Sequence, residues 1–258
     1  MLAILHIAPK RVRSNAITRW FYFVDNPETK IGMNQSTLKS VMRLFALAKQ
    51  FSSNENKDNE VKAIVENYVY EYTGVAEAED YITIFNYHNL QFNKREKSTK
   101  TQSLYSVKST IIITEVANDL SRVNRTHLAL VILDILTVGG SLSDSSLDFF
   151  RTICTIFKFS AEEQADFLSF FSITTGYTGQ NIIVVSQNQN QESGKKVIFD
   201  KLIQGEVHFL FNRSTSTILF RILSNGEIFL RDGNIINPKR NYFLPRGSVI
   251  ENYKIKPL

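Results

Sequence analysis

Basic side chains recur in the stretch "RDGNIINPKRNYFLPRGSVI" (231–250), where they could bind a phosphate group. Phosphate recognition needs a cationic fork together with hydroxyl or backbone donors. Arg213, Lys239, Arg240 and Arg246 supply such cations only if the loops that carry them converge. If those loops do not converge, the same residues form a solvated basic face.

The other reactive side chains form no recognisable catalytic motif. The Gly-Lys pair in "QESGKK" (191–196) lacks the earlier glycine and the following Ser or Thr of a nucleotide-binding phosphate loop. No serine occupies the G-x-S-x-G motif of a nucleophile elbow, and Cys154 lies in an apolar run that disfavours a thiolate. The histidines lack the spacing of metal ligands: His6, His88, His127 and His208. We therefore expect no catalysis by this chain and no cofactor.

Length and composition favour two ordinary domains without a membrane span. The chain has 258 residues, of which 43% are hydrophobic and 21% charged, and its apolar runs are too short for a membrane-spanning helix. In "MLAILHIAPKRVR" the basic residues follow the apolar stretch, which is the wrong order for a secretion signal. The single cysteine cannot form an internal disulfide. We expect a cytoplasmic protein with a poorly defined extension over residues 1–32.

The net charge of +5 is unevenly spread, with an acidic middle and a basic carboxyl-terminal part. These two parts can attract each other, or the basic part can bind an acidic partner such as nucleic acid, a phosphoprotein or an acidic protein face. Few aromatic residues stand beside the basic ones, although single-stranded nucleic acids stack on aromatic side chains. Nucleic-acid binding through the basic carboxyl-terminal domain is therefore the less favoured alternative.

Residues 33–176 show the apolar spacing of amphipathic helices. Ser36 is a candidate N-cap of the first helix, and Gly74 is a stop signal after the second. The polar segment 93–102 is predicted to be a loop, after which helical spacing resumes. Ser160 and Glu163 form a capping box before the last helix. This part of the chain is predicted to be an all-α bundle.

The apolar stripe of the first helix recurs downstream with the same spacing. Residues 160–171 likewise match residues 75–85 in length and pattern. Two copies of a three-helix unit can bury their stripes against each other, whereas a chance likeness between generic amphipathic helices is the alternative. The matched stripes are Leu38, Val41, Met42, Phe45 and Ala46 in the first copy, and Leu128, Val131, Ile132, Ile135 and Leu136 in the second.

From residue 177 the pattern changes to short β-branched runs separated by turns, which predicts a small all-β domain over residues 177–258. Asn-Gly in "SNGE" (224–227) and Asp-Gly in "RDGN" (231–234) favour tight hairpin turns. The Gln- and Asn-rich segment 186–196 is predicted to be an exposed connection. The fold class is therefore multidomain α plus β, with the helices first.

The helical part resembles the TerB-like domain of bacterial tellurite-resistance proteins, through the pseudo-repeat and "DILTVGGSLSDSSLDFFRTICTIFKFSAEEQADFLSFF" (134–171). The resemblance implies a metal site in the turn between helices, where some members carry Asp-Gly and a following acid. Here Gly139 and Gly140 replace Asp-Gly, and Asp144 and Asp148 are the carboxylates that remain. The function it implies is a metal- or stress-responsive protein that binds a divalent cation.

The segment "SNGEIFLRDGNIINPKRNYFLPRGSVI" (224–250) is similar to the last third of forkhead-associated domains, which are β sandwiches that bind phosphothreonine. This similarity adds Ser214, Ser224 and Asn225 to Arg213 and the other basic residues as candidates for phosphate or partner binding. The Gly-Arg and Ser-x-x-His settings of that family are absent from this sequence.

The order of a TerB-like helical domain and a degenerate forkhead-associated-like β domain resembles the amino-terminal region of large bacterial ATP-binding cassette proteins. In those proteins the ATPase would follow. The resemblance implies a non-catalytic interaction or regulatory module that is the front end of such a protein, or is derived from one. Its expected partner is a protein, either the ATPase or a membrane component, and the latter would bring the chain to a membrane. A phosphopeptide is the alternative ligand.

Overall fold

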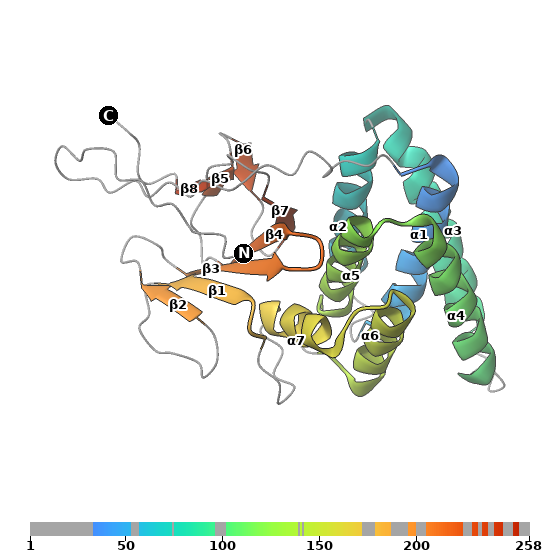
Figure 1. The fold of residues 1–258 in the computed structure, drawn as a ribbon. Coiled ribbons are helices and arrows are strands. Elements are labelled where there is room, and N and C mark those ends of the chain that lie inside the picture. Colours follow the sequence, from blue (N-terminus) through green and yellow to red (C-terminus); the bar gives the residue numbers. More distant parts are fainter. Residues whose placement is uncertain are drawn as a thin grey trace. The chain divides into compact units, whose positions relative to one another are not determined.

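The structure is a computed structural model, shown as a ribbon in Figure 1. In the described part of the chain the helices come first and the strands follow, which confirms the predicted mixed α and β composition. The predicted extension 1–32 lies outside the described residues. The described residues are 33–52, 57–73, 75–95, 102–138, 140, 142–171, 179–186, 196–199, 205–223, 229–231, 234–236, 240–244 and 250–252.

The described residues divide into two compact units. The helical unit ends at Gln164, and the sheet unit begins at Ala165. This division falls inside a helix, whereas the sequence places the domain boundary after residue 176. Each unit has its own buried apolar residues, so each is described by itself.

Seven helices occupy the described chain up to residue 170, and apolar spacing in the sequence predicts each of them. α3 is longer than predicted: it ends at Arg95, so its last three residues lie in the segment 93–102 that was predicted to be a loop. The helices are α1 (Gln35–Gln50), α2 (Asp58–Tyr72), α3 (Val75–Arg95), α4 (Gln102–Asp119), α5 (Arg122–Leu136), α6 (Asp144–Ile156) and α7 (Ala161–Phe170).

The start of α1 corrects one prediction. Asn34, and not Ser36, is the N-cap, because the Asn34 side chain accepts a hydrogen bond of 2.7 Å from the backbone N–H of Thr37. A side-chain oxygen at this position satisfies one of the amides that lack a partner in the first turn of a helix. Ser36 therefore lies inside the first turn.

α1 is the central helix of the helical unit. It packs against α3, α4 and α5, and Figure 1 shows α3 and α4 alongside it. Every residue from Leu44 to Ala48 is buried, and both stripes of the proposed repeat lie in the core. Burying one large apolar side chain contributes about 1.5–3 kcal/mol. Because α1 lies inside, the outer faces of α3 and α4 are left to solvent.

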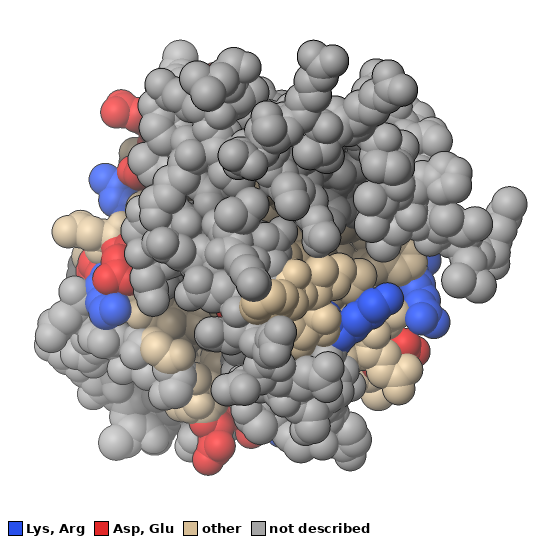
Figure 2. Space-filling view, turned by 90° about the vertical axis from the view of Figure 1, so that its left-hand side faces the viewer, with Lys and Arg blue, Asp and Glu red and all other residues tan. Residues whose placement is uncertain are grey.

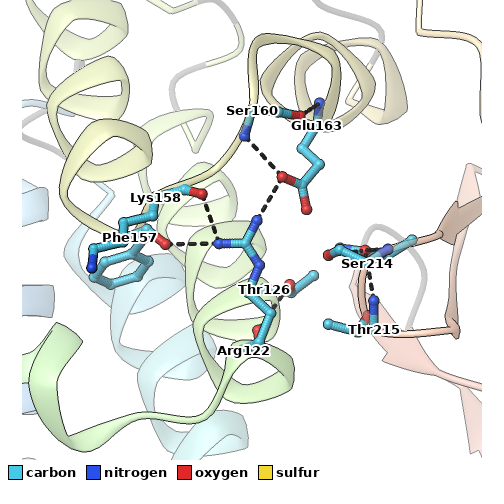
Figure 3. A network of polar contacts seen from close by, with 9 residues as sticks. Arg122, Thr126, Phe157, Lys158, Ser160, Glu163, Ser214 and Thr215 are labelled. Carbon is cyan, nitrogen blue, oxygen red and sulfur yellow. Dashed lines mark hydrogen bonds and ion pairs between the residues drawn. The ribbon is translucent and has the colours of Figure 1, made fainter.

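A polar network joins the start of α5 to the segment between α6 and α7 (Figure 3). Arg122 donates to the backbone oxygens of Phe157 (2.8 Å) and Lys158 (2.9 Å) and to Glu163 Oε2 (2.6 Å). Glu163 Oε2 also accepts from Ser160 N at 2.8 Å, and Ser160 Oγ accepts from Glu163 N at 3.1 Å. These reciprocal bonds confirm the predicted capping box and fix the first turn of α7.

The described residues of the sheet unit form two sheets. The larger sheet has the order β2-β1-β3-β4-β7, in which β1 and β2 are parallel and the other neighbours are antiparallel. The smaller sheet has the order β6-β5-β8 and is antiparallel. The strands are β1 (Ile182–Ser186), β2 (Lys196–Phe199), β3 (Glu206–Asn212), β4 (Thr217–Leu223), β5 (Phe229–Arg231), β6 (Asn234–Ile236), β7 (Asn241–Phe243) and β8 (Ile250–Asn252).

Both sheets contribute to one apolar cluster. Phe209 and Phe220 of the larger sheet belong to the same cluster as Ile236 and Ile250 of the smaller one. The alternation of side chains along a strand explains this arrangement, because every second residue points to the same face. The two sheets therefore share a core.

The larger sheet also carries buried polar side chains that meet the end of α7. His208 is fully buried, with Nδ1 3.2 Å from the Phe170 carbonyl oxygen and Nε2 2.7 Å from Glu206 Oε2. The Arg221 guanidinium lies 4.2 Å from the centre of the Phe171 ring. The buried imidazole of His208 thus has a polar neighbour at each of its ring nitrogens.

One of the two predicted hairpin turns is confirmed and the other is wrong. β5 and β6 pair with Arg231 opposite Asn234, so the two strands that flank Asp-Gly form a hairpin, as predicted. β4 and β5, in contrast, lie in different sheets, and β4 pairs with β3 and β7. β4 and β5 are therefore not the two strands of one hairpin, and the "SNGE" segment between them lies outside the described residues.

Candidate functional site

α4 exposes apolar side chains on its outer face. Val107 is 59% exposed and Ile111 is 49% exposed. Residues four apart on a helix lie one turn apart on the same face, so these two side chains are neighbours. The opposite face of α4 buries Ile112, Ile113 and Val116.

The run Ile111–Ile113 explains why α4 has apolar residues on two faces. Three consecutive residues of a helix are spread over most of its circumference, so they cannot all face the core. Ile112 and Ile113 are fully buried, and Ile111 is the one that turns outward. Its exposure follows from the helix geometry, and it leaves an apolar group in water.

α3 exposes a second pair. Tyr87 and Leu90 are each 58% exposed and lie three residues apart, again one turn along one face. The buried face of α3 carries Tyr81, Phe85 and Phe92. Since α3 and α4 both pack on α1, each of two helices of the same unit presents one apolar pair to solvent. We call these four side chains the helical apolar surface.

Charged groups of α1 and α4 lie next to this surface. Arg43 Nη1 is 3.6 Å from Glu115 Oε2, and both side chains are substantially exposed. Burial, and secondly the positive charge of Arg43, lower the pKa of His88 on α3 below its ordinary value. Arg43 therefore acts on α3 as well as on α4, and Glu115 lies one helical turn from Ile111 on α4. Such a mixture of apolar and charged groups is typical of the surfaces through which proteins bind each other.

The phosphate-binding candidates lie only partly in the described chain. Arg213 and Ser214 are in the turn between β3 and β4, and Arg240 precedes β7. The remaining candidates lie outside the described residues: Ser224, Asn225, Lys239 and Arg246. Convergence of these loops around one phosphate stays a prediction.

The turn that carries Arg213 and Ser214 is organised by Asn212. Its Oδ1 atom accepts hydrogen bonds from Ser214 N (3.0 Å), Ser214 Oγ (2.8 Å) and Thr215 N (3.3 Å). This is the local bonding by which Asn side chains favour turns. The Ser214 hydroxyl thus already donates its proton within the turn, whereas Arg213 is exposed.

The metal-site candidates stand at the start of α6. Ser143 is the N-cap of α6, Asp144 is its first residue, and Asp148 Oδ1 accepts a hydrogen bond from Arg151 Nη1 at 3.1 Å. A carboxylate near a helix amino terminus is favoured by the helix dipole without any metal. No group of three or more His, Cys, Asp or Glu side chains in the described part of the chain is arranged to hold a metal ion.

The other candidate reactive groups take part in packing. Cys154 is buried, and burial raises the pKa of its thiol far above the ordinary value. His127 Nδ1 lies 3.3 Å from the Tyr72 hydroxyl, inside the helical unit. His6 lies outside the described residues. Among the described helices, none combines the length and the apolar character needed to cross a membrane.

Charges are mixed on the face shown in Figure 2. Described Lys and Arg side chains stand at separate places there, with Asp or Glu side chains nearby. The described part of this face therefore presents no continuous basic patch of the kind on which nucleic-acid binding relies.

Sequence reasoning missed the helical apolar surface. The spacing of Leu, Ile and Val identifies amphipathic helices, but it does not distinguish apolar residues in the core from apolar residues that are exposed. One sequence feature indicates exposed apolar side chains: α4 contains more apolar residues than one helix face can hold, as in Ile111–Ile113.

Comparison of the chain with protein-family models, with curated proteins and with solved structures found no match.

Proposed function

We propose that this chain is a protein-interaction module without catalysis of its own, and that it binds a protein partner through the helical apolar surface. The observation that carries the proposal is the exposure of Val107 and Ile111 on α4 and of Tyr87 and Leu90 on α3. Exposed apolar side chains that are neighbours on a helix gain free energy when a partner covers them, about 25 cal/mol for each Å² removed from water.

The chemistry of the surface specifies the partner. A partner that covers these side chains presents apolar or aromatic groups at its centre and polar groups at its edge, where the Arg43–Glu115 pair lies. Tyr87 adds a phenolic hydroxyl beside its apolar ring, and tyrosines of this kind carry much of the energy in protein interfaces. Exposed charges next to the apolar centre give orientation more than affinity.

The identity of the partner is proposed from the domain order. A TerB-like helical domain followed by a forkhead-associated-like β domain is the order that precedes the ATPase in large bacterial ATP-binding cassette proteins. On this proposal the chain is the front end of such a protein, or derives from one, and its partner is the ATPase portion or an associated membrane component. The order of helices before strands supports this reading at the coarse level of fold class.

Site-specific photo-cross-linking tests the proposed function. A photoreactive phenylalanine analogue replaces Leu90 in one variant and Tyr70, a 46% exposed residue of α2, in the control. Each variant is expressed in the cells in which the chain naturally occurs. Irradiation is expected to give a defined cross-linked protein from position 90 and not from position 70. Adding Tyr87→Lys to the position 90 variant is expected to abolish that product. Identical products from positions 90 and 70 would contradict the proposal.

A further inference from the structure

The exposed face of α4 has a charge pattern that is complementary to itself. Lys108 and Glu115 are both exposed, and Ile111 lies between them along the helix. Residues seven apart lie two turns apart on nearly the same side of a helix, because 3.6 residues make one turn. One flank of this face therefore carries a cation towards the start of α4 and a carboxylate towards its end.

We propose that this face of α4 binds the same face of a second copy of the chain, with the two α4 helices antiparallel. The inference rests on the proposed function and names the occupant of one part of the surface. In a two-fold symmetric pair each copy contributes the same patch, so a patch can bind itself only if it is self-complementary. Antiparallel pairing satisfies this condition for α4.

The level of the residues along the helix gives the register. A two-fold axis at Ile111 places Lys108 and Glu115 about 5 Å from the axis in opposite directions, at a rise of 1.5 Å per residue. Lys108 of each copy then lies within about 1.5 Å, measured along the helix, of the level of Glu115 of the other. The two-fold symmetry also places the charged flanks of the two α4 helices on the same side of the pair. Two identical pairs of opposite charges therefore form.

Apolar contacts occupy the centre of the same arrangement. Ile111 lies at the axis against its counterpart, and Val107 lies close to the level of Thr114 in the other copy. Thr114 is exposed and offers a methyl group. The side chains that are left in water in one chain are thus covered in the pair, beside the two pairs of opposite charges.

Neighbouring charges are compatible with this pairing. Glu115 already lies 3.6 Å from Arg43 of its own chain, at the surface, and in the pair it would stand between Arg43 and the Lys108 of the other copy. Parallel pairing would instead place Lys108 against Lys108 and Glu115 against Glu115. The charges therefore select the antiparallel orientation. Tyr87 and Leu90 on α3 remain available to a different protein.

Charge reversal in the full chain tests the pairing. Sedimentation equilibrium is expected to show a reversible monomer–dimer equilibrium for the unaltered chain. Lys108→Glu and Glu115→Lys each turn two attractive contacts into repulsive ones, so each variant is expected to raise the dimer Kd about tenfold. The double variant Lys108→Glu/Glu115→Lys restores opposite charges, and its Kd is expected to return to within about threefold of the original. Tyr70→Lys on α2 is the control and leaves the Kd unchanged.

A cysteine at the proposed axis gives an independent readout. In Ile111→Cys the two thiols of the pair face each other, so mild oxidation is expected to produce disulfide-linked dimers faster than in Tyr70→Cys. The native Cys154 is buried and does not compete.

A chain that is monomeric at all concentrations, with equal oxidation rates in the two variants, would overturn the inference. So would a double charge reversal that dimerises no better than the single ones. Cross-linking from position 90 to another protein does not depend on these results, so failure of the dimer and failure of the proposed function are distinguishable.

Discussion

At the scale of residues, the environment of His88 can be tested through its titration. Burial and the nearby Arg43 lower the pKa of His88, so its titration midpoint is expected below about 6.5, the ordinary value for histidine. Arg43→Met removes the positive charge but not the burial, so the midpoint is expected to rise part of the way back. NMR of the histidine ring measures both values. A midpoint that does not change in Arg43→Met would show that Arg43 does not act on α3.

The lowered pKa of His88 has a consequence for stability. Because the folded chain binds this proton less readily than the unfolded chain, the stability that His88 contributes is present above the unfolded pKa. It is lost as the pH falls through the folded value. His88 is partly exposed, so we expect only a small acid-induced loss in the denaturation midpoint of the helical unit. His88→Gln is expected to remove that part of the pH dependence.

Arg122 is expected to contribute more to stability than any exposed ion pair. Arg122→Met removes the Arg122 donor from the backbone oxygens of Phe157 and Lys158 and one of the donors to the Glu163 carboxylate. We expect a loss of about 2–3 kcal/mol in the free energy of unfolding, measured by urea denaturation. Arg151→Met breaks the exposed pair with Asp148 and is expected to cost less than about 0.5 kcal/mol. Equal losses in the two variants would contradict the role of the network.

At the scale of elements, the contact between Gly179 and α7 is tight enough to test. A Cβ atom on Gly179 would lie 2.8 Å from the Asp166 Cα atom and 2.7 Å from its Oδ1 atom. Because backbone has to move, Gly179→Ala is expected to destabilise the sheet unit by about 3 kcal/mol or more. A Cβ atom on Gly140 would have no neighbour within 4 Å, so Gly140→Ala is expected to lower the free energy of unfolding only by the strain of a positive φ, about 1–2 kcal/mol. Thermal denaturation of both variants compares the two costs.

Sequence patterns predict elements well where local chemistry decides the outcome. The capping box of Ser160 and Glu163 and the Asp-Gly hairpin are confirmed, because both depend on residues close together in the chain. The Asn-Gly hairpin prediction is wrong, because the pairing of β4 with β7 is decided by distant residues. The Ser36 cap is wrong by two residues, since Asn34, two residues earlier in the chain, is an equally good cap.

At the scale of the whole molecule, the two compact units are expected to respond separately to core mutations. Phe220→Ala removes a fully buried ring from the cluster shared by both sheets and is expected to cost about 3–5 kcal/mol. Native-state hydrogen exchange is expected to speed up in β1, β3 and β4 and to stay nearly unchanged in α1 and α5. Equal acceleration in α1 would show that the chain unfolds as one cooperative unit.

The exposure of the helical apolar surface is also a property of the whole fold, and for this reason the sequence alone did not predict the surface. Whether Val107 or Ile113 faces water depends on where α1 lies, and the apolar pattern of α4 contains no such information. The phosphate-binding candidates raise the same problem, because convergence of loops is a property of the folded chain. Residue types suggest chemistry, but tertiary packing decides which of them are accessible.

Oxidative footprinting of the two exposed tyrosines tests the central claim most directly. Tyr87 lies on the helical apolar surface and Tyr70 on α2, and both are substantially exposed in the chain. Hydroxyl-radical labelling compares the purified chain with the chain in its native cells. Labelling of Tyr87 relative to Tyr70 is expected to fall severalfold in cells, where a protein partner covers α3. An unchanged ratio would contradict the claim that this surface is where the protein binds its partner.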